Sequence, residues 1–448
     1  MKELSGFPYV ALRFDKKAHL LDAGPLAELK AHLGQTGTTD LIVISHGWNN
    51  DMQEAEGLYA ELLGNARGLL DKGRVPGLAG RSIAVLGVLW PSKKFADKDL
   101  IPGAAAALQG TAAQEQLRAQ LELLHADADN AFDAPDAGPK LGHLLELLPS
   151  IEDNTKQAKE FIDTLRQLVV LRDGDLADVP DTLFELPAGV LLERMQQPVP
   201  FVRDDGDAAH GSAAIDDEHG GAAGLGDVIG NAISGALNAL NLVTYYQMKA
   251  RAGLVGEQGL NPILHDIAAQ LPQLRLHLVG HSFGARLVTA AAAGAGADEA
   301  TLCPVASMSL LQGAFSHYGF AEKWDDQQDG FFRRVLARQA VRGPIIATCT
   351  INDRAVGLAY PLASMLAQQV GAHLGDKNDK YGGLGRNGAQ KTPEAQDGAL
   401  LDPATDDSYA FSAGHIHNLE TRQLITDHGD VRNAAVAYAV LSAMASVQ

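Results

Sequence analysis

The sequence predicts an α/β fold in which helices cover both faces of a mostly parallel sheet, and three observations carry this prediction. Short apolar runs of strand character recur along the chain, as at residues 41–44 and 82–90. A continuous run of this kind is typical of a parallel strand that is covered on both faces. Amphipathic helical patterns separate the runs, as βαβ units require. One further apolar run enters a glycine-bounded turn at 280–284, and an Ala-rich helical pattern leaves it.

Residues 1–92 and 243–448 follow this alternation, and together they are predicted to form one core. In the first part we expect strands at 7–14, 41–44 and 82–90, with helices at 25–33 and from about 50 to 70. In the second part we expect helices at 233–253 and 261–270, a strand up to 279, strands at 306–312 and 343–353, helices at 330–340 and 361–370, a polar loop at 377–406, a strand within 414–425 and a last helix at 430–445.

Residues 93–242 break the alternation, because they contain helical patterns and no convincing buried strand. The patterns lie at 114–125, 142–148 and 154–171. We predict a helical insertion that folds over the functional site as a lid, because apolar helix stripes must be buried somewhere. An acidic loop at 204–219 has carboxylates that could bind Ca²⁺, but it lacks the full spacing of a calcium loop. A solvated loop is the favoured interpretation.

The composition excludes several classes of protein. The chain has 448 residues, 46% of them hydrophobic, and a formal net charge of −19. This charge argues against nucleic acid and anionic membrane surfaces as partners, and it suits a small-molecule substrate. Two cysteines, no apolar signal-peptide core and no run of about 18 apolar residues predict a cytoplasmic protein without a membrane segment. Export without a cleaved signal stays open, as does the oligomeric state.

The turn Gly280-His281-Ser282-Phe283-Gly284 has the G-x-S-x-G pattern of a nucleophile elbow, placed between a strand and a helix. A serine on so sharp a turn needs a strained backbone with positive φ. Gly280 and Gly284 are needed because side chains at these positions would collide. The turn raises the Ser282 hydroxyl above the sheet and leaves the Phe283 N–H at a helix start, where it can face developing negative charge. We regard His281 as a packed residue beside the elbow.

A serine nucleophile requires a base, and the base requires an orienting acid. Asp353 closes an apolar run, whereas the strand at 306–312 has no acid at its tip, and we therefore predict Asp353 as the acid. The late candidates for the base are His415, His417 and His428. We favour His428, because it lies in a loop between the last strand and the last helix, where its imidazole can reach Ser282.

His46-Gly47-Trp48 follows the strand at 41–44 and is predicted to complete the site. Glycine lets the chain approach the elbow closely, so that the Trp48 N–H can face the Phe283 N–H across a carbonyl oxygen as an oxyanion hole. The sequence contains no metal-ligand cluster and no phosphate-binding loop, and we expect neither a metal nor a nucleotide cofactor.

In these motifs the chain resembles the α/β-hydrolase superfamily of serine esterases and lipases, over about residues 1–92 and 242–448. The resemblance implies an eight-stranded, mostly parallel sheet and a two-step acyl transfer. Ser282 would attack an ester carbonyl, His428 would move the proton with Asp353 behind it, and water would release the acyl-enzyme. The insertion follows the fourth core strand, whereas members of the family more often carry a lid after the sixth.

Other functions are compatible with the same residues, since a fold does not set the chemistry. Amidase, peptidase, thioesterase and perhydrolase activities use similar constellations. A non-catalytic ligand-binding protein on a hydrolase scaffold is the alternative from another class. A secreted lipase that acts on a competitor's membrane is a third possibility.

Overall fold

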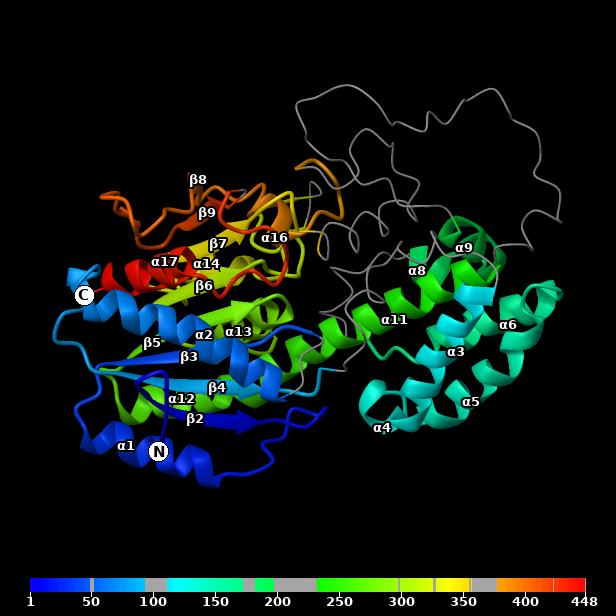
Figure 1. Cartoon of the computed structure of the whole chain (residues 1–448), viewed down its shortest axis with the longest axis horizontal. Coiled ribbons are helices and arrows are strands. Elements are labelled where there is room, and N and C mark those ends of the chain that lie inside the picture. The colour runs from blue at the N-terminus through cyan, green and yellow to red at the C-terminus, as the bar shows by residue number, and fades with distance from the viewer. Residues whose placement is uncertain are drawn as a thin grey trace.

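The computed structural model describes residues 1–48, 52–92, 111–171, 182–196, 232–296, 299–324, 328–353, 356, 377–421 and 423–447. A nine-stranded sheet in the order β1-β2-β4-β3-β5-β6-β7-β9-β8 forms the centre of an α/β unit (Figure 1). Only the β1–β2 pair is antiparallel. The strands are β1 (Lys2–Leu4), β2 (Phe7–Arg13), β3 (Asp40–Ser45), β4 (Ile83–Leu89), β5 (Arg275–His281), β6 (Ser307–Leu311), β7 (Ile345–Cys349), β8 (Ala395–Ala399) and β9 (Ile416–Glu420).

The mostly parallel sheet is confirmed, but the expected count of eight strands is wrong. All residues of β3 and β4 are buried, in agreement with their continuous apolar runs. The two strands that the sequence does not reveal are short and exposed edge strands, β1 and β8. β8 lies within the predicted loop at 377–406 and contains Asp397 and Gly398, residue types that are depleted in strands. The predicted loop is therefore corrected to a segment with one strand and one short helix.

Helices cover both faces of the sheet. One face carries α1 (Gly24–Gln35), α12 (Asn261–Gln270) and α13 (Phe283–Ala293), and the other carries α2 (Met52–Asp71) and α17 (Ala434–Ala445). These positions confirm the helices predicted around the core within the described residues, although the helix expected at 330–340 is only α14 (Arg333–Ala337). The remaining short elements around the core are η1 (Pro76–Leu78), η6 (Glu299–Thr301) and α16 (Leu384–Asn387).

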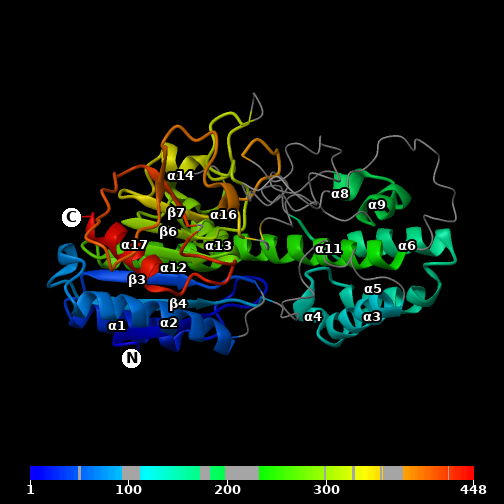
Figure 2. The same ribbon diagram turned by 45° about the horizontal axis from the view of Figure 1, so that its top comes forward.

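A group of helices lies beside the sheet, on the side towards which the parallel strands point (Figure 2). It consists of α3 (Thr111–Ala126), α4 (Ala128–Ala131), α5 (Ala137–Leu147), η4 (Leu148–Ser150), α6 (Thr155–Arg166), α8 (Thr182–Glu185) and α9 (Ala188–Met195). The three helices predicted here are found, and Asn154 caps α6 by accepting from the N–H groups of Lys156 and Gln157.

The long helix α11 (Ala232–Leu254) connects this helical group to the core. It runs through residue 242 without a break, so the insertion and the second part of the core share one helix. The π-helical segment η5 (Val255–Leu260) then leads into α12. The acidic loop at 204–219 and the helix expected at 361–370 lie outside the described residues. Among the helices that are described, none combines the length and the apolar character needed to cross a membrane.

Candidate functional site

Ser282 occupies a strained turn between β5 and α13, as the motif predicts. Its backbone has φ 58° and ψ −122°, a conformation that a non-glycine residue adopts only when its surroundings enforce it. A Cβ atom on Gly280 would lie 2.3 Å from the Gly284 carbonyl oxygen, and one on Gly284 would lie 2.2 Å from the Ser45 carbonyl oxygen. Glycine is therefore required at both positions.

The turn at 46–48 lies directly against the nucleophile turn. β3 and β5 are parallel neighbours in the register Ser45↔Gly280, so the chain leaves both strands at the same height. A Cβ atom on Gly47 would lie 2.5 Å from the Ser282 Cβ and 3.1 Å from its Oγ. The close approach that the sequence predicts for Gly47 is thus present, and it leaves no room for a side chain.

His46 holds this turn in place and remains neutral. Its ring stacks on Trp90 with a centroid distance of 5.5 Å, and its Nε2 accepts from the backbone N–H of Trp90 at 3.3 Å. Nδ1 therefore carries the proton and donates to the Gly47 carbonyl oxygen at 2.8 Å. Burial lowers the pKa of His46 to about 4, although the bond to Gly47 opposes this shift. Its role in the structure is to fix the path of the turn.

The two residues predicted to supply oxyanion donors lie close to each other. The rings of Trp48 and Phe283 are 6.0 Å apart. Phe283 is the first residue of α13, where backbone N–H groups have no partner within the helix. Tyr245 of α11 packs on both rings, with centroid distances of 4.8 Å to Phe283 and 6.0 Å to Trp48. The helix that leads out of the insertion therefore contacts this part of the site.

Asp353 and His428, which are 75 residues apart, form a hydrogen-bonded pair. Asp353 is fully buried in the turn after β7, and its Oδ2 lies 2.8 Å from His428 Nδ1. Oδ2 also accepts from Gln312 Nε2 at 3.1 Å, and Oδ1 accepts from the Val356 N–H at 2.9 Å. The carboxylate is thereby fixed in one orientation, and it in turn orients the imidazole. The structure thus brings the predicted acid and base together.

The pKa of His428 is raised above its ordinary value of 6.5. Burial lowers it, but the charge of Asp353, the hydrogen bond to that carboxylate and the charge of Asp427 together outweigh burial. The His428 side chain is still 21% exposed, so the imidazole is partly accessible. A partly accessible imidazole with a buried carboxylate behind it is suited to accept and return a proton.

His281 links the base to the nucleophile turn. Its Nε2 lies 2.9 Å from the His428 carbonyl oxygen, and the two rings are 4.9 Å apart. Since His281 directly precedes Ser282, this contact brings the His428 loop to the elbow. Among the described atoms, no hydrogen bond connects the Ser282 hydroxyl to His428. Such bonds are often long in an unliganded site and shorten when substrate binds.

The other late histidines do not take part in this arrangement. His415 is half-buried and directly precedes β9, and its Nδ1 lies 3.0 Å from the Ala413 carbonyl oxygen. His417 is buried in β9, where its Nε2 accepts from the Ser412 N–H at 3.0 Å. Both side chains bond to the backbone of residues 412–413, before β9, whereas Asp353 bonds to His428, in agreement with the predicted pair.

Gln312 is the residue of this site that the sequence does not reveal. It follows β6, is fully buried, and adopts a positive φ of 46°. Its Nε2 donates both to Asp353 Oδ2 and to the Gly385 carbonyl oxygen. The only available signal is a polar residue at the tip of a buried strand, and this signal does not identify its partner, which lies 41 residues further along the chain.

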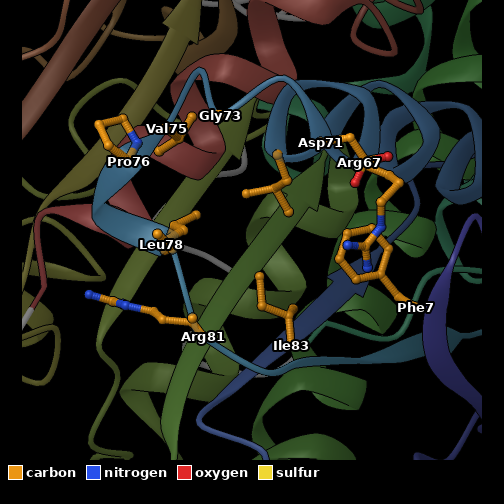
Figure 3. Close-up of a pocket in the computed structure, with 12 residues that line it drawn as sticks. Phe7, Arg67, Asp71, Gly73, Val75, Pro76, Leu78, Arg81 and Ile83 are labelled. Carbon is orange, nitrogen blue, oxygen red and sulfur yellow. The ribbon is translucent and has the colours of Figure 1, made fainter.

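A pocket of about 240 Å³ lies at the amino ends of the parallel strands, opposite the end where Ser282 lies (Figure 3). It is bordered by Phe7 and Ile83, the first residues of β2 and β4, whereas Ser282 follows the far end of β5. Arg67 lies over the Phe7 ring at 4.0 Å and donates to the Gly6 carbonyl oxygen. The pocket therefore does not belong to the site at Ser282.

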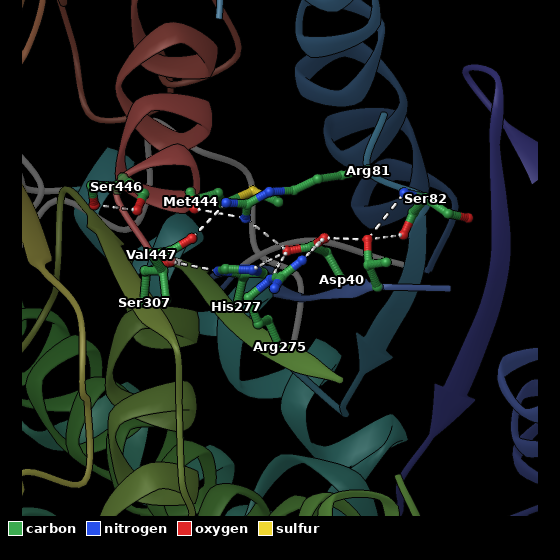
Figure 4. A network of polar contacts seen from close by, with 11 residues as sticks. Asp40, Arg81, Ser82, Arg275, His277, Ser307, Met444, Ser446 and Val447 are labelled. Atoms are coloured by element: carbon green, nitrogen blue, oxygen red, sulfur yellow. Dashed lines mark hydrogen bonds and ion pairs between the residues drawn. The ribbon is translucent and has the colours of Figure 1, made fainter. Parts of the chain in front are cut away.

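A polar network also lies at the amino ends of the strands (Figure 4). Buried Asp40 accepts from Arg275 Nε at 2.9 Å and from Arg81 at 3.2 Å, and its Oδ1 lies 2.9 Å from His277 Nε2. Arg81 also donates to the carbonyl oxygens of Met444 and Val447 at the end of α17. This network joins strands β3 and β5 to the end of the chain.

Within the described ranges, no group of three or more His, Cys, Asp and Glu side chains could hold a metal ion. Comparison with known protein families, with curated proteins and with solved structures finds no match to this chain. The chemistry of the site is therefore inferred from its own geometry.

Proposed function

We propose that the protein is a serine hydrolase of the α/β-hydrolase type that cleaves carboxylic esters through Ser282, His428 and Asp353. The observation that carries this proposal is the 2.8 Å bond between His428 and buried Asp353. His428 lies on a loop that is held to the elbow by the hydrogen bond from His281, the residue before Ser282. A strained serine, an imidazole and a buried carboxylate are the three groups that nucleophilic acyl transfer requires. They follow one another in the chain order Ser, Asp, His that is typical of this fold.

The proposed reaction proceeds in two steps, acylation of Ser282 and hydrolysis of the acyl-enzyme. Neutral His428 takes the Ser282 proton through Nε2 while Oγ attacks the ester carbonyl, and it then gives the proton to the departing alcohol. Water attacks the acyl-enzyme in the same manner, releases the carboxylic acid and restores the serine. Asp353 keeps the Nδ1 proton of His428 in place and stabilises the imidazolium. The N–H groups of Trp48 and Phe283 stabilise the oxyanion, a contribution of about 3 kcal/mol for each donor.

The proposed substrate is a small ester with an apolar group. Tyr245 places an aromatic ring against Trp48 and Phe283, beside the proposed oxyanion hole, and an apolar wall of this kind favours an apolar acyl or alcohol group. We propose that α11 and the insertion restrict entry to the site, so that short and medium esters react faster than polymers or folded proteins.

Labelling and turnover test the proposal together. A fluorophosphonate probe should modify Ser282, and a series of p-nitrophenyl esters should show a maximum at short or medium acyl length. Ser282→Ala should abolish labelling and reduce turnover by at least about 10⁴-fold, because the triad acts as one unit. Ser309→Ala serves as the matched control, because Ser309 is a buried serine in the neighbouring strand β6.

Other outcomes select the alternatives. A folded protein that takes no label at Ser282 and turns over no ester would contradict the proposal and favour a ligand-binding protein. Labelling together with faster turnover of amides or thioesters would keep the nucleophile and change the substrate class. A maximum at long acyl chains with activation at a lipid interface would indicate a lipase.

A further inference from the structure

The His281 side chain connects the nucleophile strand to the loop of the proposed base, yet the proposed triad makes no use of it. His281 is the last residue of β5, and its side chain is buried. Because the carbonyl oxygen of His428 only accepts hydrogen bonds, His281 Nε2 must carry a proton and donate it across the 2.9 Å contact. The side chain of His281, the residue before Ser282, is thus bonded to the backbone of His428.

This contact determines where His428 stands relative to Ser282. In the described part of the chain His428 makes two hydrogen bonds, one from its ring to Asp353 and one from His281 to its carbonyl oxygen. Asp353 follows β7 and His281 ends β5, with β6 between these strands. The bond to Asp353 orients the imidazole but leaves it able to pivot. The bond from His281 fixes the backbone behind the ring.

We propose that His281 is a positioning residue, which holds the His428 backbone at the distance from Ser282 that proton transfer requires. The inference rests on the proposed function. It is carried by the hydrogen bond to the His428 backbone, by the geometry of the two rings and by the burial of His281, which precedes the serine in the turn.

His281 stays neutral while it does this. Burial has the largest effect, and together with the charges of His428, Arg432 and His46 it lowers the pKa of His281 to about 3, although the bond to His428 raises it. A neutral ring 4.9 Å away does not repel the positive charge that His428 acquires when it accepts the serine proton. The residue can therefore support the base without competing for its proton.

Two substitutions at one position test the proposal. His281→Phe keeps the ring and removes the donor, and it should lower kcat for p-nitrophenyl acetate by about 10²-fold with little change in KM, because small misplacements of a base are costly. His281→Gln has an amide N–H that can replace Nε2–H, and it should recover most of that loss. If Phe does not fit, His281→Leu removes the same donor with a smaller side chain.

His417→Phe is the matched control, since His417 is also buried and also bonds to a backbone group, but in β9. It should leave kcat unchanged even if its melting temperature falls. A folded His281→Phe variant with the kcat of the wild type would overturn the proposal. So would a His281→Gln variant that has the wild-type melting temperature and no recovery of kcat.

Histidine ring NMR separates this inference from the proposed function, because it needs no turnover. Long-range ¹H–¹⁵N spectra of the full chain should show His281 as the neutral Nε2–H form between about pH 5 and 8. The His428 signals should shift and broaden in His281→Phe. If the wild type is inactive but gives these spectra, the hydrolase proposal fails and the anchoring of His428 stands. An Nδ1–H form of His281 would overturn the anchoring itself.

Discussion

At the scale of single residues, the neighbours of His428 determine how the proposed activity depends on pH. Asp353 and Asp427 raise the pKa of His428 above 6.5 in spite of burial. Below that pKa the imidazole is protonated and cannot accept the Ser282 proton. The rate therefore falls as the pH drops, and the midpoint of this fall lies higher than for an ordinary histidine.

We predict that kcat/KM for a neutral ester rises with pH and has its midpoint above pH 6.5, measured between about pH 5 and 9. Asp353→Asn removes the main cause that raises the pKa and leaves burial, which lowers it. The variant should be several orders of magnitude slower, and its midpoint should move to a lower pH. His46 and His281, whose pKa values are about 4 and 3, do not titrate in this range. A wild-type midpoint at or below pH 6.5 would contradict the assignment.

At the scale of elements, the close packing of two turns forms the site. The turn after β3 approaches the elbow after β5 so closely that Gly47 has no space for a methyl group. The nearest obstacle is the Ser282 side chain itself, so a larger residue must displace either the nucleophile or the turn that carries Trp48. The parallel register of β3 and β5 brings these turns together and leaves little freedom to adjust.

We predict that Gly47→Ala lowers kcat by at least about 10²-fold, the usual effect of losing one oxyanion donor. Steady-state kinetics and thermal unfolding would be measured together. Gly57→Ala is the control, since a Cβ atom at Gly57 in α2 meets nothing within 4 Å. This control should gain about 0.5–1 kcal/mol of stability, because alanine is the better helix former, and should keep full activity. Equal kcat for the two variants would refute the proposed geometry of the turn.

At the scale of the whole molecule, the network around Asp40 joins distant parts of the chain at the amino ends of the strands, far from Ser282 at their carboxyl ends (Figure 4). Burial raises the pKa of Asp40, but hydrogen bonds from His277, Arg275 and Thr39 lower it more, so the carboxyl stays ionised. Through Arg81 the same charge holds the last turn of α17. Its contribution to stability is present at neutral pH and is lost as the pH falls through the lowered pKa of the folded state.

Asp40→Asn should lower the free energy of unfolding by about 3 kcal/mol at pH 7, because it leaves the partly buried charges of Arg81 and Arg275 without their anion. Urea denaturation measures this loss. Asp266→Asn is the control, since the exposed pair of Asp266 with Lys30 is screened by water and contributes little. Turnover of Asp40→Asn below its unfolding transition should equal that of the wild type. Unfolding at the wild-type urea concentration would show that the network does not stabilise the fold.

The sequence by itself determined the features that depend on neighbours in the chain. Six of the nine strands follow from apolar runs, because a strand that is covered on both faces is mostly apolar, whereas β9 could be placed only within 414–425. The elbow follows from Gly280 and Gly284 around Ser282, because no residue larger than glycine fits at these two positions of so sharp a turn. The order of Ser282, Asp353 and His428 could be predicted because each follows a strand or precedes a helix whose pattern is local.

Only the tertiary structure decided which distant side chains meet. Gln312 bonds to Asp353, and His281 bonds to the backbone of residue 428, across 41 and 147 residues of chain. β8 forms at an exposed edge by pairing with β9, although its own sequence has no strand pattern. Such contacts depend on strand order and register, which are fixed by the packing of the whole core and leave no periodic signal in the residues that make them.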